Sequence, residues 1–182
     1  MKNYLKNLKI LKDGNVYSKT MEHDACGVGL IASTEGKKSR KVVEYGINAL
    51  KAVFHRGAVD ADGKTGDGAG IHLEIPSDFF AEKIELTGHK HDGSEICVGM
   101  IFLPRNDYEA QENARTIVER ELTKSNFNIY GWRQVPVNPK VLGEKANITR
   151  PEITQVLFKY NDKGLKGKDL ERKLYESRRK IE

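Results

Sequence analysis

Residues 22–36 read Glu-His-Asp-Ala-Cys-Gly-Val-Gly-Leu-Ile-Ala-Ser-Thr-Glu-Gly, with a cysteine heading an apolar run. This run predicts a buried strand over residues 26–33. Gly27 follows Cys26 directly, so another part of the backbone can approach the thiol closely. A rigidly held, approachable thiol favours a nucleophile. On the thiol alone, the commoner role of a free cysteine is that of a small buried hydrophobe.

Composition limits the class of protein. The chain has 182 residues, 38% hydrophobic and 31% charged, which fits one globular domain with a real core. No apolar run approaches the roughly 20 residues that span a bilayer, and residues 1–25 lack the apolar core of a secretory signal. The net charge of +5 gathers at the two ends, where acids interrupt the bases. We therefore expect no membrane or nucleic-acid partner. Two cysteines make no disulfide framework, so we expect a cytoplasmic protein.

Hydrophobic spacing predicts an α+β domain in layers. A helix of about 16 residues is expected to begin at Ser39 and end at residues 55–57, where a glycine follows. Residues 58–70 hold four glycines and three aspartates and predict a loop. Asn106 and Glu109 resemble a capping box. The other expected elements are strands at 71–75, 96–103 (buried on both faces), 127–136 and 152–160, and helices near 77–80, 106–122 and 169–180.

Arg56 at the predicted helix end is a second chemical candidate, because a guanidinium fork binds a carboxylate through two hydrogen bonds. A thiol attacks a carboxamide only as the thiolate and so needs a base. No histidine is clearly assigned to that task. An N-terminal α-amine, with a reference pKa near about 8, would serve. Cleavage after Ala25 would create one at Cys26, so residues 1–25 are interpreted as a leader.

Several separated motifs, in order, resemble the start of glutamate synthase large chains. They are Cys26-Gly27-Val28-Gly29, His55-Arg56-Gly57-Ala58, Thr65-Gly66-Asp67-Gly68-Ala69-Gly70-Ile71, Gly131-Trp132-Arg133-Gln134-Val135-Pro136-Val137 and Ser177-Arg178-Arg179-Lys180-Ile181-Glu182. The resemblance runs from about residue 20 to the last residue.

This resemblance implies a class II glutamine amidotransferase domain with an N-terminal-nucleophile hydrolase fold, a four-layer αββα sandwich. Residues 26–182 would hold only its first half. Cys26 would be the nucleophile, its freed α-amine the base, and Arg56 the group that binds the α-carboxylate of glutamine. Asp67 and Gly68 are expected near the substrate. Hydrolysis would proceed through a thioester and supply ammonia for making glutamate from 2-oxoglutarate.

The resemblance also implies cofactors, partners and site residues that belong to other parts of the full-length family enzyme. FMN and an iron–sulfur cluster belong to the full-length family enzyme, and none is expected in this segment. The remainder of the large chain and the small subunit would be its partners. The Asn-Gly pair of the oxyanion hole and the aspartate that holds the substrate amine lie further along in the family. We therefore expect this chain alone to be a poor enzyme or inactive, since one oxyanion-hole donor contributes on the order of 3 kcal/mol.

Two other interpretations stay open. The chain could be a non-catalytic, partner-binding fragment, or another class II amidotransferase acting on phosphoribosyl pyrophosphate or a sugar phosphate. The segment His89-Lys90-His91-Asp92 with Cys97 fits no standard zinc spacing, so no metal site is expected. Residues 65–70 lack the ending of a P-loop and are interpreted as a structural loop beside the active site. Cys97 and Trp132 are interpreted as core.

Overall fold

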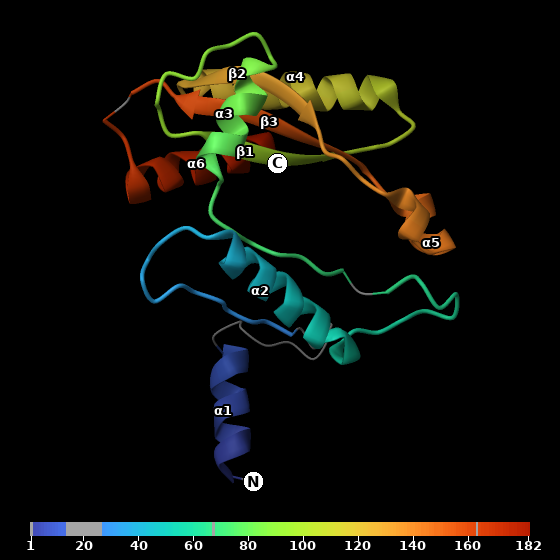
Figure 1. The fold of residues 1–182 in the computed structure, drawn as a ribbon. Coiled ribbons are helices and arrows are strands. Elements are labelled where there is room, and N and C mark those ends of the chain that lie inside the picture. The colour runs from blue at the N-terminus through green and yellow to red at the C-terminus, as the bar shows by residue number, and fades with distance from the viewer. Residues whose placement is uncertain (1, 14–26, 67, 163) are drawn as a thin grey trace. The chain divides into compact units, whose positions relative to one another are not determined.

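The computed structural model describes residues 2–13, 27–66, 68–162 and 164–182. The chain divides into two units (Figure 1). Unit 1 holds residues 1–58 and 67–71, and unit 2 holds residues 59–66 and 72–182. Cys26 and Asp67 lie outside the described residues.

Unit 1 is built from helices α1 (Lys2–Asp13) and α2 (Arg40–Ala52), followed by the short 3-10 helix η1 (Phe54–Arg56). The predicted N-cap of α2 is confirmed, because the Ser39 side chain accepts a hydrogen bond from the Lys41 backbone N–H at 3.2 Å. The predicted helix of about 16 residues is therefore α2 continued by η1. The predicted stop is confirmed at Gly57, whose N–H donates to the Phe54 carbonyl at 3.0 Å.

Unit 2 holds a three-stranded antiparallel sheet in the order β1-β3-β2. The strands are β1 (Cys97–Leu103), β2 (Phe127–Gln134) and β3 (Glu152–Tyr160). The helices of unit 2 are α3 (Ser77–Glu85), α4 (Tyr108–Lys124), η2 (Pro139–Val141), α5 (Glu144–Thr149) and α6 (Gly167–Ile181). The predicted α+β class is confirmed at this level.

Both faces of the sheet bury apolar side chains, because neighbouring residues of a strand point to opposite faces. Helices α4 and α6 cover one face, and α3 covers part of the other (Figure 1). The first core contains Cys97, Val118, Leu122, Phe127, Val156, Phe158 and Leu170. The second core contains Phe80, Ile84, Ile96, Tyr130 and Leu157. The pairing register shifts between Ile129 and Gly131, and Tyr130 at this bulge enters the second core.

Two predicted strands are wrong in this structure. Residues 27–33 and 71–75 have no strand assignment. Val28 and Leu30 are 94% and 89% exposed, and Ile71 and Leu73 are 44% exposed. Their sequences favour an extended backbone, but a strand forms only where a neighbouring strand completes its hydrogen-bond ladder.

Two smaller predictions about unit 2 also need correction. The strand at 96–103 was expected to be buried on both faces, but Met100 and Phe102 are 47% and 63% exposed, because α3 does not reach them. Helix α4 is capped by Asp107 rather than Asn106, since the Asp107 carboxylate accepts from the Ala110 N–H at 2.9 Å. Asn106 instead accepts a hydrogen bond from the Arg105 Nε at 3.4 Å.

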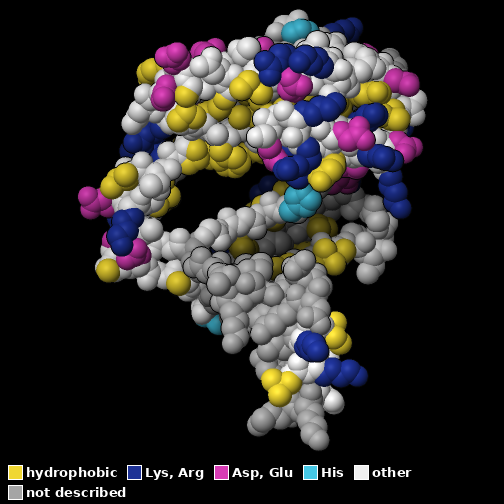
Figure 2. Space-filling model, turned by 180° about the vertical axis from the view of Figure 1, so that it is seen from behind, with side chains coloured by type: hydrophobic (Ala, Val, Ile, Leu, Met, Phe, Trp, Pro, Cys, Tyr) yellow, Lys and Arg dark blue, Asp and Glu magenta, His cyan; other side chains and the backbone are white. Residues whose placement is uncertain are grey.

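The surface of unit 2 mixes charge of both signs. On the face seen in Figure 2, basic and acidic side chains lie among apolar ones rather than in a patch of one sign. In the described part of the chain, no helix is long and apolar enough to cross a bilayer.

Candidate functional site

Two of the four predicted site residues, Arg56 and Gly68, lie within the described residues. Cys26 and Asp67 lie outside the described residues, and Arg56 is described only as the last backbone position of η1. Gly68 is described, as an exposed residue without helix or strand structure. The described residues therefore do not place these four side chains together, and their roles stay predictions.

Helix α2 nevertheless lies against the glycine-rich segment that carries Gly68. A Cβ built at Gly46, in the middle of α2, would come within 3.0 Å of the Ile71 Cδ1 atom. Only a residue without a side chain allows this close approach without displacing Ile71. The contact places the helix that leads to Arg56 beside the segment that leads from Gly68, both within unit 1.

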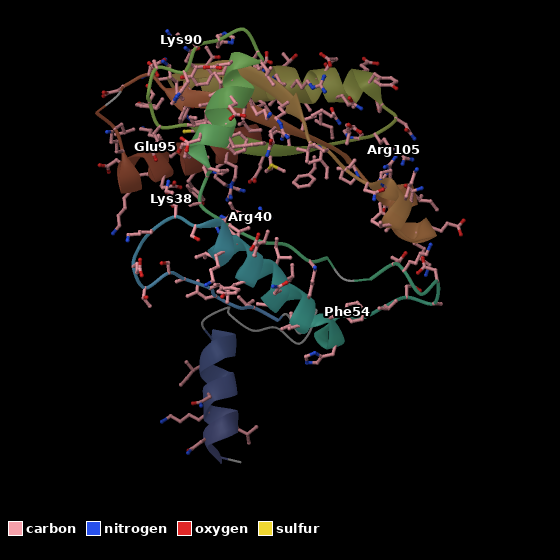
Figure 3. The ribbon with its side chains drawn as sticks, in the orientation of Figure 1. Lys38, Arg40, Phe54, Lys90, Glu95 and Arg105 are labelled. Carbon is pink, nitrogen blue, oxygen red and sulfur yellow. The ribbon has the colours of Figure 1, made fainter. Side chains whose placement is uncertain are left out.

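His55, which follows α2, forms a hydrogen bond with the backbone of that helix. The Nδ1 atom of His55 lies 3.2 Å from the Ala52 carbonyl oxygen, which can only accept, so this contact requires the proton on Nδ1. Phe54 beside it is 77% exposed, at the end of α2 labelled in Figure 3. The His55 side chain is exposed.

The loop before Asp67 is an ordered turn held by Asp62. Its ends pair through the Val59–Gly66 bridge. The Asp62 Oδ1 atom accepts from the backbone N–H groups of Lys64 at 2.9 Å and Thr65 at 2.7 Å, and Oδ2 accepts from the Thr65 hydroxyl at 2.5 Å. Sequence reasoning missed Asp62 and Thr65, although an Asp-Gly-x-Thr stretch is the signal of such a turn.

These hydrogen bonds predict the titration of Asp62. The Thr65 hydroxyl, followed by the Lys64 and Thr65 N–H groups, lowers the pKa of the Asp62 carboxyl from 3.8 to about 2. Because the folded pKa is depressed, the carboxylate supports the turn fully above pH 3.8 and loses this effect as the pH falls toward about 2. We expect the carboxyl carbon resonance of Asp62 to titrate with that lower midpoint. Thr65→Val should raise it, and a midpoint of 3.8 in the unaltered chain would contradict the turn.

Cys97 is unsuited to be the nucleophile. It is 3% exposed within β1, and burial raises the pKa of its thiol to about 12. A thiol that stays protonated does not attack a carbonyl. The prediction that Cys97 belongs to the core is confirmed. Trp132 packs against the same core while its Nε1 donates to the Glu119 carboxylate at 2.6 Å, so it too has a structural role.

The histidine-rich segment before β1 has structural partners of its own. The Nε2 atom of His91 lies 2.8 Å from the Ser94 carbonyl, and Lys159 of β3 donates to Asp92 at 2.8 Å. This ion pair raises the pKa of Lys159, while burial raises the pKa of Tyr130 beside it. Among the residues that the structure describes, no group of three or more His, Cys, Asp and Glu side chains could hold a metal ion.

The cysteine content does not fit an iron–sulfur cluster either. Such clusters are held by several cysteine thiolates, commonly four. The chain has two cysteines, and Cys97 is buried with a raised thiol pKa. The cysteines of this chain therefore cannot hold such a cluster by themselves.

Comparison with known proteins identifies the family. The family model described as "Glutamine amidotransferases class-II" matches residues 26–182. The glutamate synthase [NADPH] large chain of Azospirillum brasilense is 53% identical over 176 residues, which is 97% of this chain and 12% of that protein. Ferredoxin-dependent glutamate synthase 2 of Synechocystis is 40% identical over 158 residues, covering 86% of this chain and 10% of that protein.

A plant protein gives the same result. The chloroplastic ferredoxin-dependent glutamate synthase 2 of Arabidopsis thaliana is 38% identical over 162 residues, or 88% of this chain. The chain spans only about a tenth of the length of these curated relatives. The family model covers far more than half of the chain. The chain belongs to the class II glutamine amidotransferases.

Proposed function

We propose that this chain is the glutamine-hydrolysing region of a glutamate synthase large chain. The observation that supports this most directly is that the family match begins at residue 26, the predicted nucleophile. A relative named as a glutamate synthase [NADPH] large chain aligns with 97% of this chain. Residues 1–25 would be a leader, whose removal makes Cys26 the first residue.

In the proposed reaction, the α-amine of Cys26 takes the proton of the thiol, and Sγ attacks the amide carbon of the glutamine side chain. The carbon–nitrogen bond breaks, and the nitrogen leaves as ammonia with the proton that the amine returns. Water then cleaves the thioester, which releases glutamate and restores the thiol. Arg56 holds the α-carboxylate of the substrate, and Asp67 and Gly68 lie beside it.

The rest of the proposal concerns the full protein. The sheet and helices of unit 2 would form part of an N-terminal-nucleophile hydrolase sandwich of four layers, two sheets between two layers of helices. The ammonia would aminate 2-oxoglutarate at a distant site that uses FMN and an iron–sulfur cluster, in the remainder of the large chain, with a small subunit as partner. A reducing cytoplasm suits a free thiol nucleophile and is the proposed location.

Replacing Arg56 with lysine in the full-length protein tests the substrate role. Lysine keeps the charge but loses the two parallel hydrogen bonds to a carboxylate. We expect the KM for glutamine to rise about 10- to 100-fold, with a smaller change in kcat. The measurement is ammonia release as a function of glutamine concentration.

Arg40 supplies the matched control for this substitution. It lies at the other end of α2, is exposed, and pairs with Glu44 at 3.2 Å. Arg40→Lys should leave the KM unchanged. An unaltered KM in Arg56→Lys would remove Arg56 from the substrate site.

A further inference from the structure

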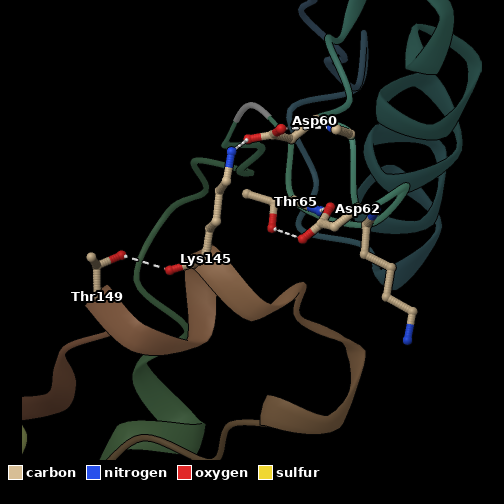
Figure 4. Close-up of polar contacts among 7 residues, drawn as sticks. Asp60, Asp62, Thr65, Lys145 and Thr149 are labelled. Atoms are coloured by element: carbon tan, nitrogen blue, oxygen red, sulfur yellow. Dashed lines mark hydrogen bonds and ion pairs between the residues drawn. The ribbon is translucent and has the colours of Figure 1, made fainter.

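Helix α5 and the loop of residues 59–66 lie side by side in unit 2, although they are far apart in the sequence (Figure 4). The Lys145 Nζ atom donates to the Asp60 Oδ2 atom at 2.7 Å. The Glu144 N–H also faces the Asp62 carboxylate and helps to lower its pKa. Two consecutive residues of α5 thus meet the two acidic side chains of the loop.

Gly143, directly before α5, makes this contact sterically demanding. It is buried, and a Cβ built there would lie 2.6 Å from the Thr65 backbone nitrogen. The same Cβ would lie still closer to Thr65 Oγ1 and Asp62 Oδ2. At least one of these contacts is with backbone, which cannot rotate away, so any side chain at Gly143 must displace the loop.

Helix α5 is itself fastened to the sheet. The Arg105 Nη1 atom, two residues after β1, donates to the Asn147 carbonyl at 3.1 Å, and Figure 3 shows Arg105 beside α5. The Thr149 hydroxyl closes the last turn on the Lys145 carbonyl at 3.4 Å (Figure 4). The loop of residues 59–66 contacts α5, and α5 is in turn hydrogen-bonded to Arg105, which follows β1.

We propose that Gly143 and Lys145, acting on Asp60, Asp62 and Thr65, form a clamp that positions the glutamine-binding segment. Thr65 is held by the clamp, and only Gly66 separates it from Asp67. This inference rests on the proposed function, in which Asp67 and Gly68 lie beside glutamine. The clamp residues are positioning residues, because they act through the loop and not on the substrate.

The test is the kinetics of glutamine hydrolysis by the full-length protein carrying changes in the clamp. Thr65→Val removes the hydroxyl that donates to Asp62, whereas Thr65→Ser keeps it. We expect Thr65→Val to raise the KM for glutamine about tenfold and Thr65→Ser to restore it. Gly143→Ala should raise the KM by up to about 100-fold, since a small misplacement of a binding group has effects of that size.

Gly99 gives the matched control for a glycine-to-alanine change. A Cβ at Gly99 in β1 would come within 2.7 Å of the Val156 Cγ1 atom, so Gly99→Ala strains the core instead of the clamp. This variant should lose stability without a rise in KM. If Gly143→Ala fails to fold, the pair of Thr65 variants decides the matter.

The outcomes separate the two proposals. Glutamine hydrolysis by the unaltered protein, with the same KM in Thr65→Val and Thr65→Ser, would overturn the clamp and leave the proposed function standing. Equal rises in KM for Gly143→Ala and Gly99→Ala would also overturn it, because general strain would then suffice. No hydrolysis by the unaltered protein would overturn the proposed function and the clamp's role with it.

Discussion

Replacing Cys26 with alanine in the full-length protein is expected to abolish glutamine hydrolysis. Without Sγ there is no atom to form the thioester, and the remaining groups can only bind the substrate. Loss of a catalytic nucleophile lowers kcat by about 10⁴-fold or more. Ammonia release at saturating glutamine measures the effect.

Two comparisons make the Cys26→Ala result specific. Cys97→Ala removes the buried thiol of β1 and should keep the activity, because that thiol stays protonated. Cys26→Ala supplied with an ammonium salt should still form glutamate from 2-oxoglutarate, since only the source of ammonia is lost. Retained glutamine hydrolysis by Cys26→Ala would eliminate the nucleophile assignment.

Leu157→Ala is expected to destabilise unit 2 by about 3 kcal/mol, the middle of the range for buried leucines. Leu157 is fully buried at 0% exposure in the central strand β3, between β1 and β2, and belongs to the second core. Truncation there leaves a cavity that the paired neighbours on both sides cannot close. Urea unfolding followed by the fluorescence of Trp132, the single tryptophan, gives the change in free energy.

Met100 is the matched control for Leu157. It lies on the neighbouring strand β1 and is 47% exposed, so Met100→Ala should change the free energy of unfolding by only about 0.5 kcal/mol. Equal effects of the two substitutions would show that the sheet does not pack as described.

The elements predicted best from the sequence are the strands that pair with one another in the sheet of unit 2. The expected strand at 152–160 is β3 with the same bounds, because its apolar residues face two cores. The segments 26–33 and 71–75 also have apolar sequences, but residues 27–33 and 71–75 have no strand assignment. Propensity favours an extended backbone, whereas a strand exists only when a partner completes its hydrogen bonds.

The candidate site residues Cys26, Arg56, Asp67 and Gly68 stand in short motifs. The resemblance of these motifs to glutamate synthase large chains is the source of their proposed roles, which stay predictions. The ion pair of Lys145 with Asp60 joins residues 85 positions apart in the sequence, and no local sequence pattern predicts it. The role of Gly143 is also hidden from the sequence, because it depends on the close contact with Thr65 and Asp62, which are distant in the chain.

The most direct test of the central claim is the mass of the N-terminal peptide and of the peptide that contains Cys97, in the protein purified from its native cell. The sample is first treated with an electrophilic glutamine analogue, such as a diazoketone, that alkylates thiol nucleophiles. We predict a chain that begins at Cys26, with one analogue attached to that residue and none to Cys97. A chain that begins at Met1, or an unlabelled Cys26, would contradict an N-terminal cysteine that hydrolyses glutamine.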